Sequence, residues 1–179
     1  MNNEQLSKTK ELYNGICKLI NNPTVHISLL QAFPQIKNIS PDKIFWIDTL
    51  KFMAYISSAD GEISQREVNV MNYITGIYMP FDSVQGLIDD SEFLSDVTNV
   101  PLTVKILCEI ENMLYRNDAV SGSNSLMNTL IVYFQSVGGL VADADNEISS
   151  IEFTRINKYI TAIKDYAKNN TLSPFFVYE

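Results

Sequence analysis

The spacing of apolar and polar residues predicts helices along most of this chain of 179 residues. Apolar positions recur every three or four residues, which is the spacing that lines one face of an α-helix. No window alternates apolar and polar residues between hairpin turns, so the sequence offers no source for a sheet. We therefore expect an all-α single domain of about seven to eight helices, drawn from the segments 4–20, 24–33, 41–58, 65–78, 83–90, 91–97, 102–114, 125–142 and 150–167.

Two of these segments, 41–58 and 125–142, are apolar on nearly every face. A helix of that kind is buried, so both should lie at the centre of the fold. The first begins with Ser40-Pro41-Asp42, which combines a capping hydroxyl, a proline at the first helical position and an acid at the positive end of the helix dipole. The second contains Gly138 and Gly139, which would let a neighbouring backbone approach closely.

Each central helix runs into an acidic turn, and the two turns have nearly the same sequence. Residues 59–67 read ADGEISQRE and residues 144–152 read ADNEISSIE, with six of nine positions identical. The register is kept without a gap, because Asp60 and Asp145 are 85 residues apart, as are Glu67 and Glu152. We expect an internal pseudo-two-fold repeat of a helix–acidic turn–helix unit, which could bring the two turns together.

Helix capping explains part of this pattern. Ser64-x-x-Glu67 and Ser149-x-x-Glu152 have the spacing of capping boxes. In such a box the serine oxygen accepts from the amide at the third helical position, and the glutamate accepts from the serine amide. Capping alone therefore accounts for serine and glutamate at these positions.

Capping does not account for the other acids, because the end of the preceding helix disfavours a carboxylate. These acids are Asp60, Glu62, Asp143, Asp145 and Glu147. An EF-hand calcium loop is excluded, since its first ligand position holds Ile56 in one copy and Val141 in the other. Two hypotheses stay open: solvated acids and caps alone, or a hard divalent cation, calcium or magnesium, on some of the oxygens. The candidate metal ligands are Asp60, Glu67, Asp143, Asp145 and Glu152.

The composition limits the classes of partner and of chemical activity that the protein is expected to have. A net charge of −8 argues against a nucleic-acid partner, because that affinity is carried by clustered Lys and Arg. We expect a cytoplasmic protein without direct membrane insertion, since neither a signal peptide nor a membrane-spanning run is evident and Cys17 and Cys108 suit a helical core. His26 is the only histidine and is expected to be structural. We find no catalytic constellation and expect no enzyme activity.

With these residues in view, the sequence resembles the TerB-like family of tellurite-resistance-associated proteins. The features are KFMAYISSADGEIS at residues 51–64 with Glu67, and VADADNEIS at residues 141–149 with Glu152. The second motif departs from the family pattern, because Asn146 replaces a glycine. The resemblance implies about seven helices with internal pseudo-symmetry and an acidic surface that binds divalent metal. Its residues would be Asp60, Glu67, Asp145 and Glu152, with Asp143 and Glu62 as weaker members.

The resemblance covers roughly residues 41–168. We accordingly divide the chain into an N-terminal helical extension at 1–40, a TerB-like domain at 41–170 and a C-terminal tail at 171–179. The loop 117–124 is expected to separate the two halves. The aromatic residues of the tail are expected to dock on the domain or to bind a partner.

The leading hypothesis is a non-enzymatic TerB-like module of a bacterial stress or defence system. It would bind a divalent cation, a protein partner or both through the duplicated acidic face. A rival is an acidic interaction domain without a metal site, for example a toxin inhibitor, whose charge suits a basic partner. A third is a metal-dependent hydrolase, which needs a substrate pocket that the sequence does not reveal. The sequence leaves the oligomeric state open.

Overall fold

Helices account for most of the described chain, and the described ranges contain no strand. The computed structural model describes residues 3–59, 61, 63–95, 97, 99–117, 125–145 and 149–172, with the backbone alone at positions 24–26, 28, 35 and 91. The elements are α1(Asn3–Ile20), α2(Pro23–Ala32), the short 3₁₀ helix η1(Pro34–Ile36), α3(Pro41–Ser57), α4(Gln65–Thr75), α5(Phe81–Asp89), α6(Ser91–Leu94), α7(Leu102–Arg116), α8(Leu126–Ala142) and α9(Ser150–Asn170). The all-α prediction is confirmed.

The predicted helix starts agree with the structure to within two residues, whereas α4 and α6 each end three residues earlier than predicted. Apolar spacing suggested that the helix after the first acidic turn continues to Tyr78, but α4 ends at Thr75. Gly76 takes a left-handed φ of 71° there, which stops the helix. The side chain of Asn72 then donates to the carbonyl of Met79 and accepts from its amide, both at 2.9 Å. Tyr78 consequently lies outside the helix and is 82% exposed.

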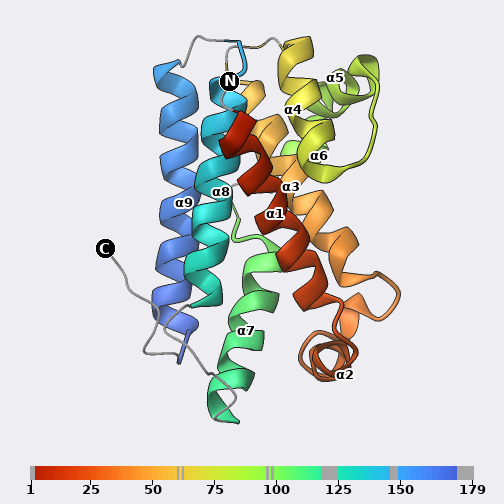
Figure 1. Cartoon of the computed structure of the whole chain (residues 1–179), viewed down its shortest axis with the longest axis vertical. Helices are drawn as coiled ribbons and strands as arrows, with labels where there is room; N and C mark the ends of the chain where they lie inside the picture. The colour runs from red at the N-terminus through yellow and green to blue at the C-terminus, as the bar shows by residue number, and fades with distance from the viewer. Residues whose placement is uncertain are drawn as a thin grey trace.

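The two helices predicted to be central, α3 and α8, form the middle of the fold. They pack on each other, and each also contacts α1, α7 and α9. Figure 1 shows α9 along α8, with α1 crossing in front of α3. No helix in the described part of the chain is long and apolar enough to cross a membrane.

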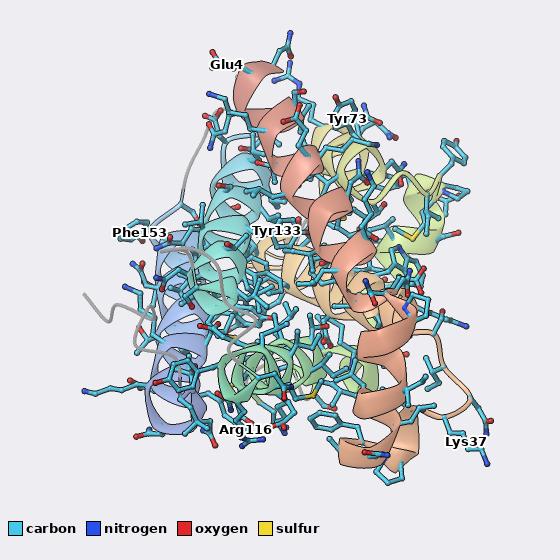
Figure 2. All side chains as sticks on the ribbon, turned by 60° about the horizontal axis from the view of Figure 1, so that its bottom comes forward. Glu4, Lys37, Tyr73, Arg116, Tyr133 and Phe153 are labelled. Carbon is cyan, nitrogen blue, oxygen red and sulfur yellow. The ribbon has the colours of Figure 1, made fainter. Side chains whose placement is uncertain are left out.

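An aromatic cluster joins four helices in the core. Tyr13 of α1 stacks on Phe45 of α3, with ring centroids 5.0 Å apart, and Phe45 lies 5.2 Å from Tyr133 of α8. About two turns further along α3, Phe52 stacks on Tyr159 of α9 with centroids 4.2 Å apart. The hydroxyl groups of Tyr133 and Thr49 are hydrogen-bonded at 3.1 Å, which satisfies both in the apolar interior. Tyr133 lies at the centre of the bundle in Figure 2.

The core-facing side of α9 differs from the prediction in its first turn. The spacing of apolar residues in the segment 150–167 puts Phe153 on one stripe with Ile156, Ile160, Ile163 and Ala167, but Phe153 is 60% exposed. Glu152 takes the inward position instead, four residues before Ile156, because its carboxylate folds back to cap the helix. Apolar spacing could not anticipate a buried glutamate in that place.

Gly138 lies where α8 crosses α9. A Cβ atom built on Gly138 would stand 2.9 Å from Cγ1 of Ile156, so only a glycine fits the present spacing. Gly139 has nothing within 4 Å of the same construction. The predicted close approach is therefore confirmed at Gly138 but not at Gly139.

The remaining expectations concern the two cysteines, the single histidine, the 117–124 loop and the C-terminal tail. Cys108 is buried and Cys17 is half-buried, and burial raises the pKa of each thiol to about 11, in keeping with core residues. The side chain of His26, most of the 117–124 loop and the aromatic tail from residue 173 lie outside the described residues. Before the tail, the amide of Leu172 donates to Asn112 of α7 at 2.6 Å, which ties the end of α9 to the bundle.

Candidate functional site

The backbone repeats itself at the two helix ends that lead into the acidic turns. After α3, the amide of Ser58 donates to the carbonyl of Ala54 at 2.9 Å. After α8, the amide of Asp143 donates to the carbonyl of Gly139 at 3.0 Å. Ser58 and Asp143 differ by the same 85 residues as the sequence repeat, so the duplicated sequence gives a duplicated local structure. Gly61 in the first turn has a φ of 88°, the left-handed conformation expected for it.

Both predicted capping boxes are present. At the start of α4, the Ser64 amide donates to Oε2 of Glu67 at 2.7 Å, and the Glu67 amide donates to Oγ of Ser64 at 3.2 Å. At the start of α9, the Ser149 amide donates to Oε2 of Glu152 at 2.8 Å, and the Glu152 amide donates to Oγ of Ser149 at 3.1 Å. One oxygen of each glutamate is therefore engaged by the backbone.

The residues that broke the EF-hand pattern are core residues. Ile56 is 0% exposed and Val141 is 1% exposed, each near the end of its helix. Neither position could present an oxygen ligand to a cation, which agrees with the exclusion of an EF-hand.

Glu67 is only 4% exposed, and its surroundings disfavour the charged carboxylate. Burial raises its pKa above the usual 4.5, and the negative charge of Asp145 from the second turn raises it further. Hydrogen bonds from the amide of Ser64 and from the hydroxyls of Ser57 and Ser64 act in the opposite direction but do not cancel the effect of burial. Glu67 of the first turn therefore lies within electrostatic range of Asp145 of the second.

Arg155 of α9 connects the second repeat directly to the end of α3. Its Nη1 donates to the carbonyl of Tyr55 and, at 2.7 Å, to Oγ of Ser58. Its guanidinium also lies over the Tyr55 ring, 4.7 Å from the centroid. The last carbonyls of a helix carry partial negative charge, so a cation is favourable there. This residue thereby supplies a positive charge beside the acidic turns.

The structure brings some of the candidate metal ligands together and does not describe all of them. Glu67 and Glu152 are buried in their capping boxes, and Asp143 and Asp145 are half-buried at the end of α8. Asp60, Glu62 and Glu147 fall outside the described residues. Among the described side chains, no three acids, histidines or cysteines are grouped as ligands of a metal ion. The expectation of calcium or magnesium stays a prediction.

Two residues with long-range contacts were not foreseen, one beside the acidic turns and one at the opposite end of α8. Arg155 acts on a carbonyl 100 residues away, and no local pattern in the sequence signals such a contact. Glu111 of α7 is the other, because its Oε2 accepts from Oγ of Ser125 and from the amide of Met127, both at 2.9 Å, and so caps the start of α8. A buried acid on an otherwise apolar helix stripe was the only available hint.

Comparison with known proteins adds no relative: no family model, no curated protein and no solved structure matches the chain.

Proposed function

We propose that this protein is a non-enzymatic TerB-like module of a bacterial stress or defence system. It binds a divalent cation, a protein partner or both through its duplicated acidic face. The observation that carries the proposal is the proximity of the two acidic turns, which belong to opposite halves of the sequence. Electrostatic influence of Asp145 on Glu67 and the contact of Arg155 with Ser58 both support this proximity.

The packing of the helices supports an internal pseudo-two-fold relation, in which α3 corresponds to α8 and α4 to α9. Under that relation the contact of α3 with α9 has its counterpart in the contact of α4 with α8, and both are present. The axis would pass between α3 and α8, which pack on each other. Equivalent turns would then lie on the same face of the molecule, as the TerB-like resemblance implies.

The charge of this face supports a cationic ligand. The chain carries a net charge of −8, and the two turns contribute several acids within a few residues of each other. Repulsion between Asp145 and Glu67 raises the cost of keeping both ionised, and a bound cation would relieve it. Calcium and magnesium prefer oxygen ligands, whereas a basic protein would use the same field to speed its association.

The alternative is an acidic interaction domain without a metal site, such as a toxin inhibitor. It is favoured by one specific observation, the capping boxes, which occupy at least one carboxylate oxygen of Glu67 and of Glu152. The remaining acids would then be a solvated surface for a basic partner.

Thermal unfolding of the chelator-treated protein separates these two possibilities. Calcium or magnesium at a hundred times its dissociation constant should stabilise the protein by about 2.7 kcal/mol if a specific site exists. The double variant Asp60→Asn with Asp145→Asn should lose that gain. A control with the same change of charge, Asp82→Asn with Glu92→Gln, removes two exposed acids elsewhere and should keep it.

If millimolar metal leaves the unfolding midpoint of the wild-type protein unchanged, the cation part of the proposal is wrong and the interaction domain is favoured. In that case association with a basic partner should slow steeply as salt is raised, and the Asp60/Asp145 double variant should reduce the association rate more than the control.

A further inference from the structure

A pocket of 510 Å³ lies between α1, α7 and the start of α8. Its walls are apolar side chains from all three helices, namely Leu12, Ile16 and Leu19 of α1, Leu107 of α7 and Leu126 of α8. Since α8 is 17 residues long, its start lies roughly 25 Å from the acidic turn that follows Ala142. This pocket is therefore separate from the acidic turns.

The face of α1 that lines the pocket is open at its centre. Leu12, Gly15 and Leu19 follow one another at spacings of three and four residues, so they share one face of the helix. A Cβ atom built on Gly15 would have nothing within 4 Å, and Leu12 and Leu19 are only half-buried. The volume is in the usual range of ligand-binding pockets. The described residues thus leave an apolar groove with room for further side chains.

The charged side chains at the pocket do not select an ion. Lys8 and Glu11 have opposite charges, and both are exposed. Lys8 is already paired with Glu4 of the same helix, with 2.6 Å between Nζ and Oε1. The pocket therefore suits an apolar occupant, whose burial is driven by the hydrophobic effect.

Two stretches outside the described residues adjoin α7, α8 or α9 in the sequence, and one of them has the composition to fill the pocket. Residues 118–124, between α7 and α8, read DAVSGSN, in which Val120 is the one large apolar residue. Residues 173–179, after α9, read SPFFVYE, in which four consecutive residues are apolar or aromatic. Because an aromatic side chain buries roughly 150–250 Å², the second stretch has much more apolar surface to remove from water.

The second stretch starts near the pocket. The amide of Leu172 donates to Oδ1 of Asn112 on α7 at 2.6 Å. The preceding residue of α7, Glu111, accepts from the amide of Met127 at 2.9 Å. Met127 directly follows Leu126, which lines the pocket. The end of α9 is therefore held close to the start of α8.

The length of the stretch is sufficient to reach the pocket. Residues 175–178 are three to six positions beyond Leu172, which corresponds to roughly 10–20 Å of extended chain. Pro174 favours an extended path, because a proline disfavours the helical conformation at the residue before it. We propose that residues 175–178 dock in this pocket of the same chain, with their apolar side chains against the leucines of α1, α7 and α8. The proposal does not rest on the function proposed for the acidic turns.

Fluorescence anisotropy with a labelled peptide of sequence SPFFVYE tests the docking in the chain of 179 residues. The double variant Phe175→Ser with Phe176→Ser should free the pocket, so it should bind the peptide saturably and one-to-one. The wild type should bind the peptide at least tenfold more weakly, because its own tethered segment competes at a high effective concentration. The matched control, Tyr78→Ser with Phe153→Ser, removes two exposed aromatic residues elsewhere and should bind as weakly as the wild type.

A substitution inside the pocket tests where the segment docks. In the Phe175/Phe176 double variant, Gly15→Leu places a side chain in the pocket and should weaken peptide binding at least tenfold. Asn14→Leu makes a similar addition at the exposed neighbouring residue and should leave binding unchanged. Far-ultraviolet circular dichroism should be the same for all variants. Equal binding by the two α1 variants would overturn the assignment to this pocket.

The occupant is tested by the same proteins. Absence of saturable peptide binding by the double variant at millimolar peptide would overturn the proposal. Equal binding by the wild type and the double variant would overturn it as well, because the pocket would then be open to a peptide from another protein. Sedimentation of the wild type as a dimer and of the double variant as a monomer would mean that the segment docks on a second copy, which contradicts docking within one chain.

Discussion

At the scale of single residues, buried glutamates share one role in this protein. Glu67, Glu111 and Glu152 are the buried carboxylates of the described chain, and each accepts from a backbone amide at the start of a helix. The negative charge lies at the positive end of α4, α8 or α9, where the helix dipole favours it. The sequence predicted two of these caps because they are local, and it missed Glu111 because its partner is 16 residues away.

The raised pKa of Glu67 gives a testable pH dependence. The variant Glu67→Gln keeps a residue that can close the capping box but removes the titrating group. A raised pKa means that the folded state keeps its proton at pH values at which the unfolded state has lost it. The stability of the wild type relative to the variant should therefore fall as pH rises above 4.5 and level off beyond the folded-state pKa.

Urea unfolding of both proteins between pH 4 and pH 8 measures this difference directly. Glu92→Gln, an exposed acid on α6, serves as the reference for removing one surface charge over the same range. A difference between wild type and Glu67→Gln that rises with pH would contradict the assigned direction of the shift.

Arg155 gives a second prediction at this scale, because a lysine cannot reproduce its planar fork of donors. The variant Arg155→Lys should lower the free energy of unfolding by about 1.5–3 kcal/mol, the range for hydrogen bonds that involve a charged group. Amide exchange at Ser58 and Ala59 should become faster in the same variant. Lys158→Ala, an exposed residue on the same helix, should change stability by no more than about 0.5 kcal/mol, and an equal loss in both variants would argue against the contact.

At the scale of elements, the contact between α8 and α9 depends on one glycine of a pair. Gly138 is buried against Ile156, whereas its neighbour Gly139 is open on the side where a Cβ atom would lie. Both lie inside α8, four and three residues before its last residue Ala142, where glycine is less favourable than alanine. The two positions therefore differ only in what surrounds them.

Alanine at these two positions should have opposite effects. Gly139→Ala should stabilise the protein by about 0.5–1 kcal/mol through the gain in helix propensity. Gly138→Ala should destabilise it by about 1–2 kcal/mol net, because overpacking against the β-branched Ile156 exceeds the same gain. Chemical denaturation of the pair measures both, and stabilisation by both substitutions would mean that α9 moves away from α8 at little cost.

At the scale of the whole molecule, α1 shares one core with the helices of both repeats. Tyr13 stacks on Phe45, and Phe45 and Tyr133 continue the aromatic cluster across α3 and α8. This packing bears on the expectation that residues 1–40 are an extension added to a separate domain, because an extension should be removable without loss of the core.

The variant Tyr13→Ala distinguishes these possibilities. Removal of a buried aromatic ring should lower the free energy of unfolding by about 3–5 kcal/mol if α1 belongs to the cooperative unit. Circular dichroism and the fluorescence of Trp46, the single tryptophan, should then report one transition at a lower urea concentration. The exposed neighbour Asn14→Ala is the control, and a main transition that keeps its wild-type midpoint would favour the extension.

The local sequence determined the helices, their starts and both capping boxes. The start of α3 at Pro41 and the boxes at Ser64 and Ser149 depend on residues within one helical turn, so chemistry and spacing are enough to predict them. The end of α4 was missed because the loop that Asn72 closes onto Met79 competes with a continuing apolar stripe.

The sequence by itself also determined that the acidic turn occurs twice, because the two copies have the same spacing of acids and this is visible in the sequence alone. Only the tertiary structure decided that Glu67 of one turn lies within electrostatic range of Asp145 of the other, and that Arg155 of α9 contacts the end of α3. Each of these depends on residues that are distant in the chain, such as Arg155 and Tyr55 at 100 positions. Their contact is fixed by the packing of α3, α8 and α9, because burial of the apolar helix faces determines which surfaces meet. The local sequence pattern does not predict this contact.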